Sequence, residues 1–196
     1  MFTTNIPLPI KSFTALFAGI LLLFMLTHGL KAEERVAGPK YDAQGQLIRI
    51  DGWRQWVFIG APLTPNSLND GKAAFPEFHN VYMEPTAFAH YVETGRFPNG
   101  TMIAKELLSV GDTEAVSGTG YFQGDFQGLE FAVKDTKRFP NEPGGWTYYS
   151  FGHALPYEKV AKAFPTEACA SCHVAAAEYD MVFLQYYPVL KAAGPK

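Results

Sequence analysis

The chain has 196 residues, of which 47% are hydrophobic, 15% aromatic and 18% charged, and its formal charge is −3 at pH 7. This length suits one compact domain with a real core, and the aromatic share favours a large apolar cavity. The net negative charge argues against nucleic acid as a partner, because binding it requires a basic face.

Residues 1–32 have the pattern of an export signal. Lys11 supplies a positive charge, residues 13–26 form an apolar run, and Ala32 ends the segment with a small residue suited to cleavage. The run is short for a membrane-spanning helix, which needs about 20 apolar residues. Leu30 suits the cleavage site poorly, so an uncleaved anchor is the alternative to a signal peptide.

Cleavage would leave residues 33–196 as a single domain. The signal carries two lysines and no acidic residue, so its removal changes the formal charge from −3 to −5. Export by such a signal predicts a periplasmic protein.

The first part of this domain is mostly irregular. Residues 33–52 are polar and predict an arm over the surface. Residues 53–59 predict a buried anchor, which is too short to be assigned to helix or strand. Residues 61–75 are rich in Pro, Asn, Asp and Gly, which predicts a loop.

Regular structure begins with a strand, a helix and a second strand. Residues 77–83 alternate as a strand does and place His79 on the same face as two apolar residues. Pro85 suits the first turn of a helix, and Gly95 its C-terminal end. Residues 101–110 are largely apolar on both faces, so this strand is expected to be central and covered on both sides.

A second long strand is expected at 121–134. It is interrupted by Gly124 and Gly128, which predict a bulge or the close approach of a bulky group. The residues between the two long strands, 111–120, predict a loop, as do residues 135–145.

The C-terminal part adds one strand and several helices. Residues 146–151 predict a strand, and residues 157–164 predict a helix. A further helix follows Pro165, with Thr166 as its N-cap, and an apolar stretch closes the chain at 180–193. Because strands come mainly first and helices follow, we predict an α+β domain: a predominantly antiparallel sheet with a few helices, one of them C-terminal.

That C-terminal helix carries Cys169-Ala-Ser-Cys172-His173, the spacing of a c-type haem attachment site. One helical turn lets both sulfurs reach the two vinyl groups on one haem edge and form thioethers. The following imidazole of His173 can then bind iron as an axial ligand. These are the only two cysteines in the chain.

Two other uses of such a pair fit the sequence less well. A redox disulfide of the thioredoxin type belongs near a βαβ unit, and this motif lies near the C-terminus without one. A structural zinc site needs four ligands, and only His79, His90 and His153 remain after residues 1–32 to complete it.

Lys105 lies between Ile103 and Leu107 on an apolar strand face, where a cation is costly to bury. Its amine can reach water along the sheet or pair with a carboxylate. Alternatively, the amine is neutral and bonded to a group inside a pocket. The periodicity of the strand leaves both interpretations open.

Several stretches together resemble the cytochrome P-460 family over about residues 45–193. They are 63–72, 97–107, 120–130, 137–146, Cys169–His173, 180–183 and 187–190. The resemblance implies a mostly antiparallel β fold, usually in a homodimer. It also implies a c-type haem cross-linked through a meso carbon to a lysine nitrogen, and Lys105 occupies the matching position.

The resemblance also implies further site residues. Glu130 matches the pocket carboxylate of the family, which makes it the candidate acid–base group that accepts the protons released when hydroxylamine is oxidised. Pairing with Lys134 or another cation is the alternative role. His79 stands where some members carry an arginine. If it faces the distal cavity, it is a candidate catalytic residue that donates a hydrogen bond or titrates near neutral pH, and otherwise it is an ordinary core histidine. Met83, Met102 and Met181 could each bind iron in principle. Met102 lies across the strand from Lys105, and we expect an open sixth position.

The family further implies an enzyme that oxidises hydroxylamine to nitrous oxide or nitrite and passes electrons to a soluble c-type cytochrome. One alternative is a gas-binding protein without turnover, as in the related cytochromes c prime beta, which lack the lysine and cap the iron with aromatic residues. The other alternative is a simple electron-transfer cytochrome c, which requires a filled sixth position.

Overall fold

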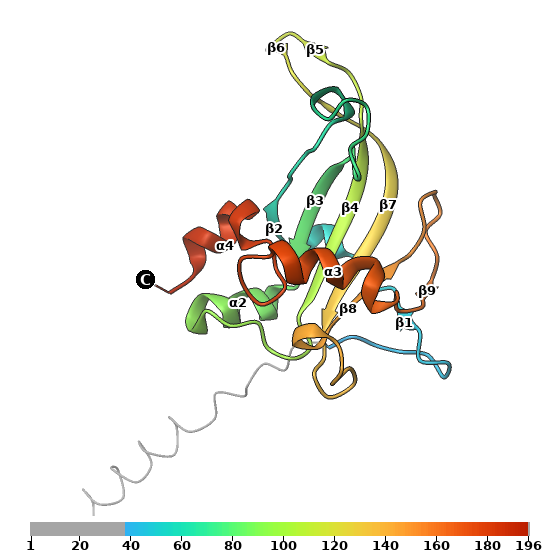
Figure 1. The fold of residues 1–196 in the computed structure, drawn as a ribbon, viewed down its shortest axis with the longest axis vertical. Coiled ribbons are helices and arrows are strands. Elements are labelled where there is room, and N and C mark those ends of the chain that lie inside the picture. The colour runs from blue at the N-terminus through green and yellow to red at the C-terminus, as the bar shows by residue number, and fades with distance from the viewer. Residues whose placement is uncertain (1–37, 196) are drawn as a thin grey trace, which may run out of the picture. The chain divides into compact units, whose positions relative to one another are not determined.

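The computed structural model describes residues 38–195 and is built on a five-stranded antiparallel sheet (Figure 1). Its spatial order is β2 (Val57–Gly60), β3 (Phe78–Met83), β4 (Met102–Val110), β7 (Gln123–Lys134) and β8 (Trp146–Ser150). The central strand is β4, as its two apolar faces predict, and the predicted α+β class is confirmed.

The remaining elements are short. The helices are α2 (Pro85–Thr94), α3 (Thr166–Ala176) and α4 (Pro188–Ala193), with 3-10 turns η1 (Trp53–Gln55), η2 (Asn66–Leu68), η3 (Pro143–Gly145) and η4 (Leu184–Tyr186). Two minor sheets pair β1 (Leu47–Ile48) with β9 (Val160–Ala161), and β5 (Glu114–Ala115) with β6 (Gly118–Thr119).

The sequence predicts a cleaved export signal at residues 1–32, with an uncleaved membrane anchor as the alternative. The predicted signal at residues 1–32 lies outside the described residues. Between residues 38 and 195, none of the helices has both the length and the apolar character needed to cross a bilayer.

Helix α2 shows how local signals set an element's ends. Pro85 occupies its first turn, where the missing N–H is not needed. The Glu84 carboxylate accepts a hydrogen bond from the Ala87 N–H at 2.8 Å, which caps the N-terminus. Gly95 ends the helix with φ of 68°, as the sequence predicts.

Each face of the sheet carries its own apolar cluster. The face toward the helices, which we call the α3 face, packs against α2 and α4 through Ile59, Val81, Met83, Ala87, Tyr91, Phe97, Ile103, Trp146, Val182 and Leu190. The far face packs against the N-terminal segments through Leu47, Trp53, Met102, Ala104, Leu129, Phe131, Val133, Tyr149, Phe151, Tyr157 and Ala161. Figure 1 shows α3 lying across the sheet.

The predicted irregularity in β7 is confirmed. The register between β4 and β7 shifts where Leu107 pairs with Gly128 and Leu108 pairs with Phe126. A Cβ at Gly128 would lie 2.9 Å from His153 Nδ1 and 3.0 Å from Leu107 Cδ1, so any other residue there would require these side chains to shift.

Three sequence-based predictions were wrong. Residues 157–164 are not helical, because β9 pairs with β1, whose Leu47 is buried and which itself lies in the predicted irregular arm. The predicted loop 111–120 contains the β5–β6 hairpin. Thr166 is the first residue of α3 rather than its N-cap, and its hydroxyl donates to the Glu142 carboxylate at 2.8 Å.

Candidate functional site

The centre of the candidate site is a row of residues across the α3 face. Val81 pairs with Lys105, Lys105 with Glu130, and Glu130 with Ser150, so these four side chains share one face. Lys105 Nζ lies 2.6 Å from Glu130 Oε2, and the two side chains are 26% and 21% exposed. The Lys105 amine also lies 5.1 Å from the centroid of the Phe75 ring.

The attachment motif lies on α3, with Cys169 half-buried and Cys172 exposed. The two thiols are separated by one helical turn, as the motif predicts. The His173 ring packs between the rings of Tyr148 and Phe183, at centroid distances of 4.7 and 4.5 Å. The β-sheet therefore holds one side of the imidazole through Tyr148, which lies on β8.

The hydrogen bonding of His173 fixes which nitrogen is available. Its Nδ1–H donates to the backbone carbonyl of Met181 at 2.6 Å. Burial lowers the pKa of His173, the bond to Met181 opposes this, and the Lys105 ammonium adds to the lowering. A neutral imidazole with Nδ1 engaged leaves Nε2 as the metal-binding nitrogen, the arrangement found for most histidine ligands.

Electrostatic effects show that the row and the motif share one environment. Burial raises the pKa of the Cys169 thiol, Glu130 adds to the rise, and Lys105 opposes it. Lys105 acts likewise on His173, as described above. The fold thus brings together residues more than sixty positions apart in the chain.

His79 belongs to the same site. It pairs with Leu107 on β4, one row beyond Lys105, and its ring meets the Phe75 ring edge-on with centroids 6.0 Å apart. Its Nε2 is buried without a hydrogen-bond partner. The pKa of His79 is lowered to about 4, mainly by burial and also by Lys105, with an opposing effect of Glu130. At neutral pH the imidazole is therefore uncharged.

The residues of this site fit a covalently attached haem. Cys169 and Cys172 supply the two sulfurs, and His173 offers a neutral imidazole with Nε2 available. The buried Nε2 of His79 and the buried hydroxyl of Tyr148 have no partner within the described residues, so both can accommodate a further group.

Two of the alternative assignments can be compared with the structure. Within residues 38–195, no three His, Cys, Asp or Glu side chains gather as a metal-binding group, so the zinc site has no set of ligands there. Met102 is buried in the far-face cluster, as expected, and Met83 is fully buried in the cluster under α2. Met181 contributes its backbone carbonyl to His173.

Of the two roles for Glu130, the structure shows the pairing with a cation. Its cation is Lys105, whereas Lys134 pairs with Asp180, at 2.5 Å. Residues four apart along a strand are about 13 Å apart, which is too far for an ion pair between Glu130 and Lys134. Glu130 is therefore the carboxylate partner that a partly buried Lys105 ammonium needs.

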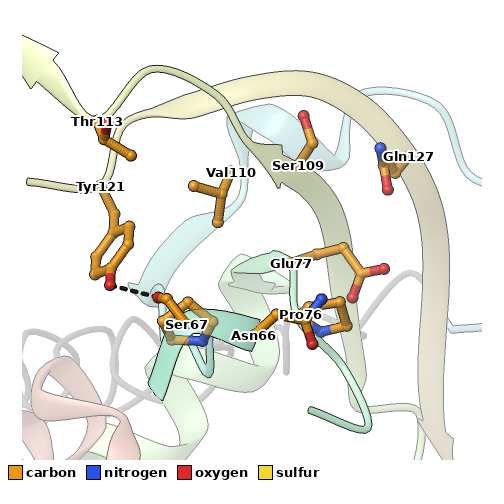
Figure 2. Close-up of a pocket in the computed structure, with 10 residues that line it drawn as sticks. Asn66, Ser67, Pro76, Glu77, Ser109, Val110, Thr113, Tyr121 and Gln127 are labelled. Carbon is orange, nitrogen blue, oxygen red and sulfur yellow. Dashed lines mark hydrogen bonds between the residues drawn. The ribbon is translucent and has the colours of Figure 1, made fainter. Parts of the chain in front are cut away.

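A pocket of about 340 Å³ lies along the same strands beyond His79. Glu77, two residues before His79, and Ser109, two residues after Leu107, line it (Figure 2). Across the pocket, the hydroxyls of Ser67 and Tyr121 are hydrogen-bonded at 2.6 Å. One carboxylate oxygen of Glu77 is buried without a partner.

Sequence reasoning missed several residues of the site. Glu77 could have been found, because strand alternation places it on the face of His79. Phe75, Tyr148 and Phe183 come from a loop, a strand and the segment after α3, and no sequence signal links them. The contacts of Tyr148 and Phe183 with His173 depend on how α3 and the segment after it pack on the sheet, whereas the contact of Phe75 with His79 depends on how the loop before β3 folds back on that strand.

A family model, Cytochrome P460, matches residues 50–184 of the chain. The search of curated proteins finds no match. The matched range covers well over half of the chain and contains the whole five-stranded sheet and α3. It therefore includes every site residue from Phe75 to Phe183.

Proposed function

Because the chain belongs to the cytochrome P460 family of haem proteins, we propose that it oxidises hydroxylamine at a covalent haem c. Cys169 and Cys172 would hold the haem by thioethers, and His173 Nε2 would bind the iron. The haem supplies a site that accepts electrons from the substrate. The single observation that carries the proposal is the Lys105–Glu130 pair. This pair lies beside His79 and faces the attachment helix α3.

Lys105 is the residue proposed to form the cross-link to the macrocycle. Its amine lies on the central strand and faces α3, where it influences Cys169 and His173 alike. A lysine nitrogen bonded to a haem carbon would no longer carry the ammonium charge. Glu130 would then lose its cationic partner and become available for protons.

Glu130 is the proposed proton acceptor. Oxidising two molecules of hydroxylamine to nitrous oxide and water releases four protons with four electrons, and oxidation with water to nitrite releases five protons with four electrons. A carboxylate that is only about one-fifth exposed can take a proton from a substrate on this face. The electrons pass to the soluble c-type cytochrome proposed as acceptor.

His79 has a different proposed role. Because its pKa is about 4, the imidazole is uncharged at neutral pH and does not titrate there, contrary to one of the roles that the sequence suggested. An uncharged imidazole can still donate one hydrogen bond and accept another. We propose that His79 orients a small polar substrate between the Lys105 row and the pocket lined by Glu77, and that it does not act as an acid.

The cellular setting is part of the proposal. The signal-like residues 1–32 and the thioether chemistry of a c-type haem both support a periplasmic protein. The homodimer rests on the family resemblance. A second candidate function, gas binding without turnover, is favoured by one observation. Phe75, 51% exposed, lies over the Lys105 amine and could cap a ligand site.

The test is hydroxylamine oxidation by the purified holoprotein with an added electron acceptor, with the optical spectrum of the reduced protein. Lys105→Leu should keep covalent haem, show an ordinary c-type spectrum and lose oxidation. Lys137→Leu removes an exposed lysine and should change neither. Gas binding without turnover in the wild type would favour the second function. An unchanged Lys105→Leu spectrum would exclude the cross-link, and failure to bind cyanide or nitric oxide would indicate a simple electron carrier.

A further inference from the structure

A strained turn follows the attachment helix. Asp180 and Met181 have φ of 44° and 63°, so two consecutive non-glycine residues lie in the left-handed region. Tyr179 and Val182 flank them and form a bridge, with the Val182 N–H donating to the Tyr179 carbonyl at 2.8 Å. Side chains disfavour this backbone conformation, which persists only where surrounding contacts hold it.

Those contacts come from Asp180. One carboxylate oxygen accepts from Lys134 Nζ at 2.5 Å, and the other accepts from the Trp146 indole N–H at 3.3 Å. Lys134 and Trp146 are paired neighbours on β7 and β8, so a rigid part of the sheet holds the turn. Lys134 and Asp180 are largely buried, with side chains 14% and 20% exposed.

Glycine at position 144 allows the turn to pack closely. A Cβ there would lie 3.2 Å from Asp180 Oδ1 and 3.4 Å from Met181 Cγ. Gly144 itself has φ of 60°, which other residues rarely adopt. The turn is therefore held by the sheet through Lys134 and Trp146 and is enclosed by the η3 loop.

This arrangement fixes the position of the Met181 backbone carbonyl. Met181, the second residue of the turn, presents its backbone oxygen 2.6 Å from His173 Nδ1. We propose that Lys134, Trp146 and Asp180 form a positioning site for the haem-binding histidine. By fixing the Met181 carbonyl, they fix the orientation of the imidazole and its strength as an iron ligand. The inference rests on haem attachment through His173 and not on hydroxylamine as substrate.

The chemical effect has a definite sign. A hydrogen bond from Nδ1–H to a carbonyl makes the imidazole a stronger electron donor at Nε2. A stronger donor favours ferric over ferrous iron and lowers the reduction potential. Releasing the turn should therefore raise the potential and lower the iron–histidine stretching frequency.

Lys134→Met separates this mechanism from a plain charge effect. Removing a nearby positive charge would by itself favour ferric iron and lower the potential. Loss of the Asp180 contact frees the Met181 carbonyl and shifts the potential in the opposite direction. The experiment measures the midpoint potential of the holoprotein by redox titration and the iron–histidine stretch of the reduced protein by resonance Raman spectroscopy.

Two further variants complete the design. Trp146→Phe deletes one hydrogen bond to Asp180 without changing any charge, so its upward shift in potential cannot be a charge effect. Lys137→Met removes an exposed lysine from the neighbouring loop and controls for charge. We expect a higher potential and a lower stretching frequency for Lys134→Met and a smaller change of the same sign for Trp146→Phe.

The outcomes are distinct. A lower potential in Lys134→Met with an unchanged stretching frequency would overturn the inference in favour of charge alone. No change in either variant would overturn it in favour of a purely structural turn. If Lys134→Met does not accumulate as folded protein, Trp146→Phe, which changes no charge, tests the inference by itself. Hydroxylamine oxidation enters neither readout, so failure of the proposed activity leaves the test intact.

Discussion

Replacing His79 with leucine tests whether this imidazole is buried and uncharged in the folded protein. Burial lowers the pKa of His79 to about 4, compared with 6.5 for an exposed histidine. The unfolded chain therefore binds a proton in a pH range where the native site does not. The native state loses stability as the pH falls below 6.5, and the loss is nearly complete near pH 4.

The size of the effect follows from the two pKa values. A tenfold change in proton affinity is worth about 1.4 kcal/mol. The difference between 6.5 and about 4 thus corresponds to a loss of about 3 kcal/mol between pH 7 and pH 4. His79→Leu removes the titrating group, so the variant should lack this part of the acid destabilisation, whatever the constant cost of the replacement.

The assay is urea denaturation of both proteins at a series of pH values, with the unfolding free energy extrapolated to water. The free-energy difference between wild type and His79→Leu should change by about 3 kcal/mol from pH 7 to pH 4. His153→Leu, which removes an exposed imidazole, should keep the wild-type profile. Parallel profiles for wild type and His79→Leu would refute a buried neutral histidine.

Three further predictions concern the far face, the proposed base and a glycine. Arg54→Met should destabilise the protein by about 3–5 kcal/mol, because Glu106, 1% exposed, would lose the only cation that pairs with it between residues 38 and 195. Arg54→Met with Glu106→Leu should recover most of this in urea denaturation. Glu130→Gln should lower kcat for hydroxylamine by roughly 100-fold with an unchanged spectrum, and a wild-type kcat would exclude Glu130 as the proton acceptor. Gly145→Ala should cost about 1–3 kcal/mol, since φ is 72° and a Cβ would lie 2.7 Å from Thr136 Cγ2; an unchanged unfolding midpoint would contradict this.

The controls for these variants come from the same chain. Arg49 pairs with Asp51, whose side chain is 81% exposed, so Asp51→Asn should cost less than about 1 kcal/mol. A loss as large as that of Arg54→Met would show that burial of Glu106 does not decide the effect.

Much of the site could be predicted because its signals are local. The spacing of Cys169, Cys172 and His173 fits one helical turn, and α3 provides that turn. The alternation around Lys105 predicted a central strand, and β4 is central. Pro85 and Gly95 predicted both ends of α2. Each of these depends on backbone geometry within a few residues.

Other features depend on which segments meet. Residues 157–164 carry a helical pattern, but pairing of β9 with β1 keeps them extended. Local propensity is a weak preference, which strand pairing and burial readily outweigh. The left-handed backbone at Asp180 and Met181 likewise could not be predicted, because no glycine marks it in the sequence. The sheet holds this conformation through the contacts of Lys134 and Trp146 with Asp180.

The sequence by itself therefore determined the chemical groups of this protein: two thiols and an imidazole at haem spacing, and a lysine on an apolar strand. Tertiary structure alone decided their partners. Strand register pairs Lys105 with Glu130, and packing of the segment after α3 brings the Met181 carbonyl to His173. The reason is physical: spacing along a helix or strand acts over a few residues, whereas these contacts join segments that only the folded sheet holds together.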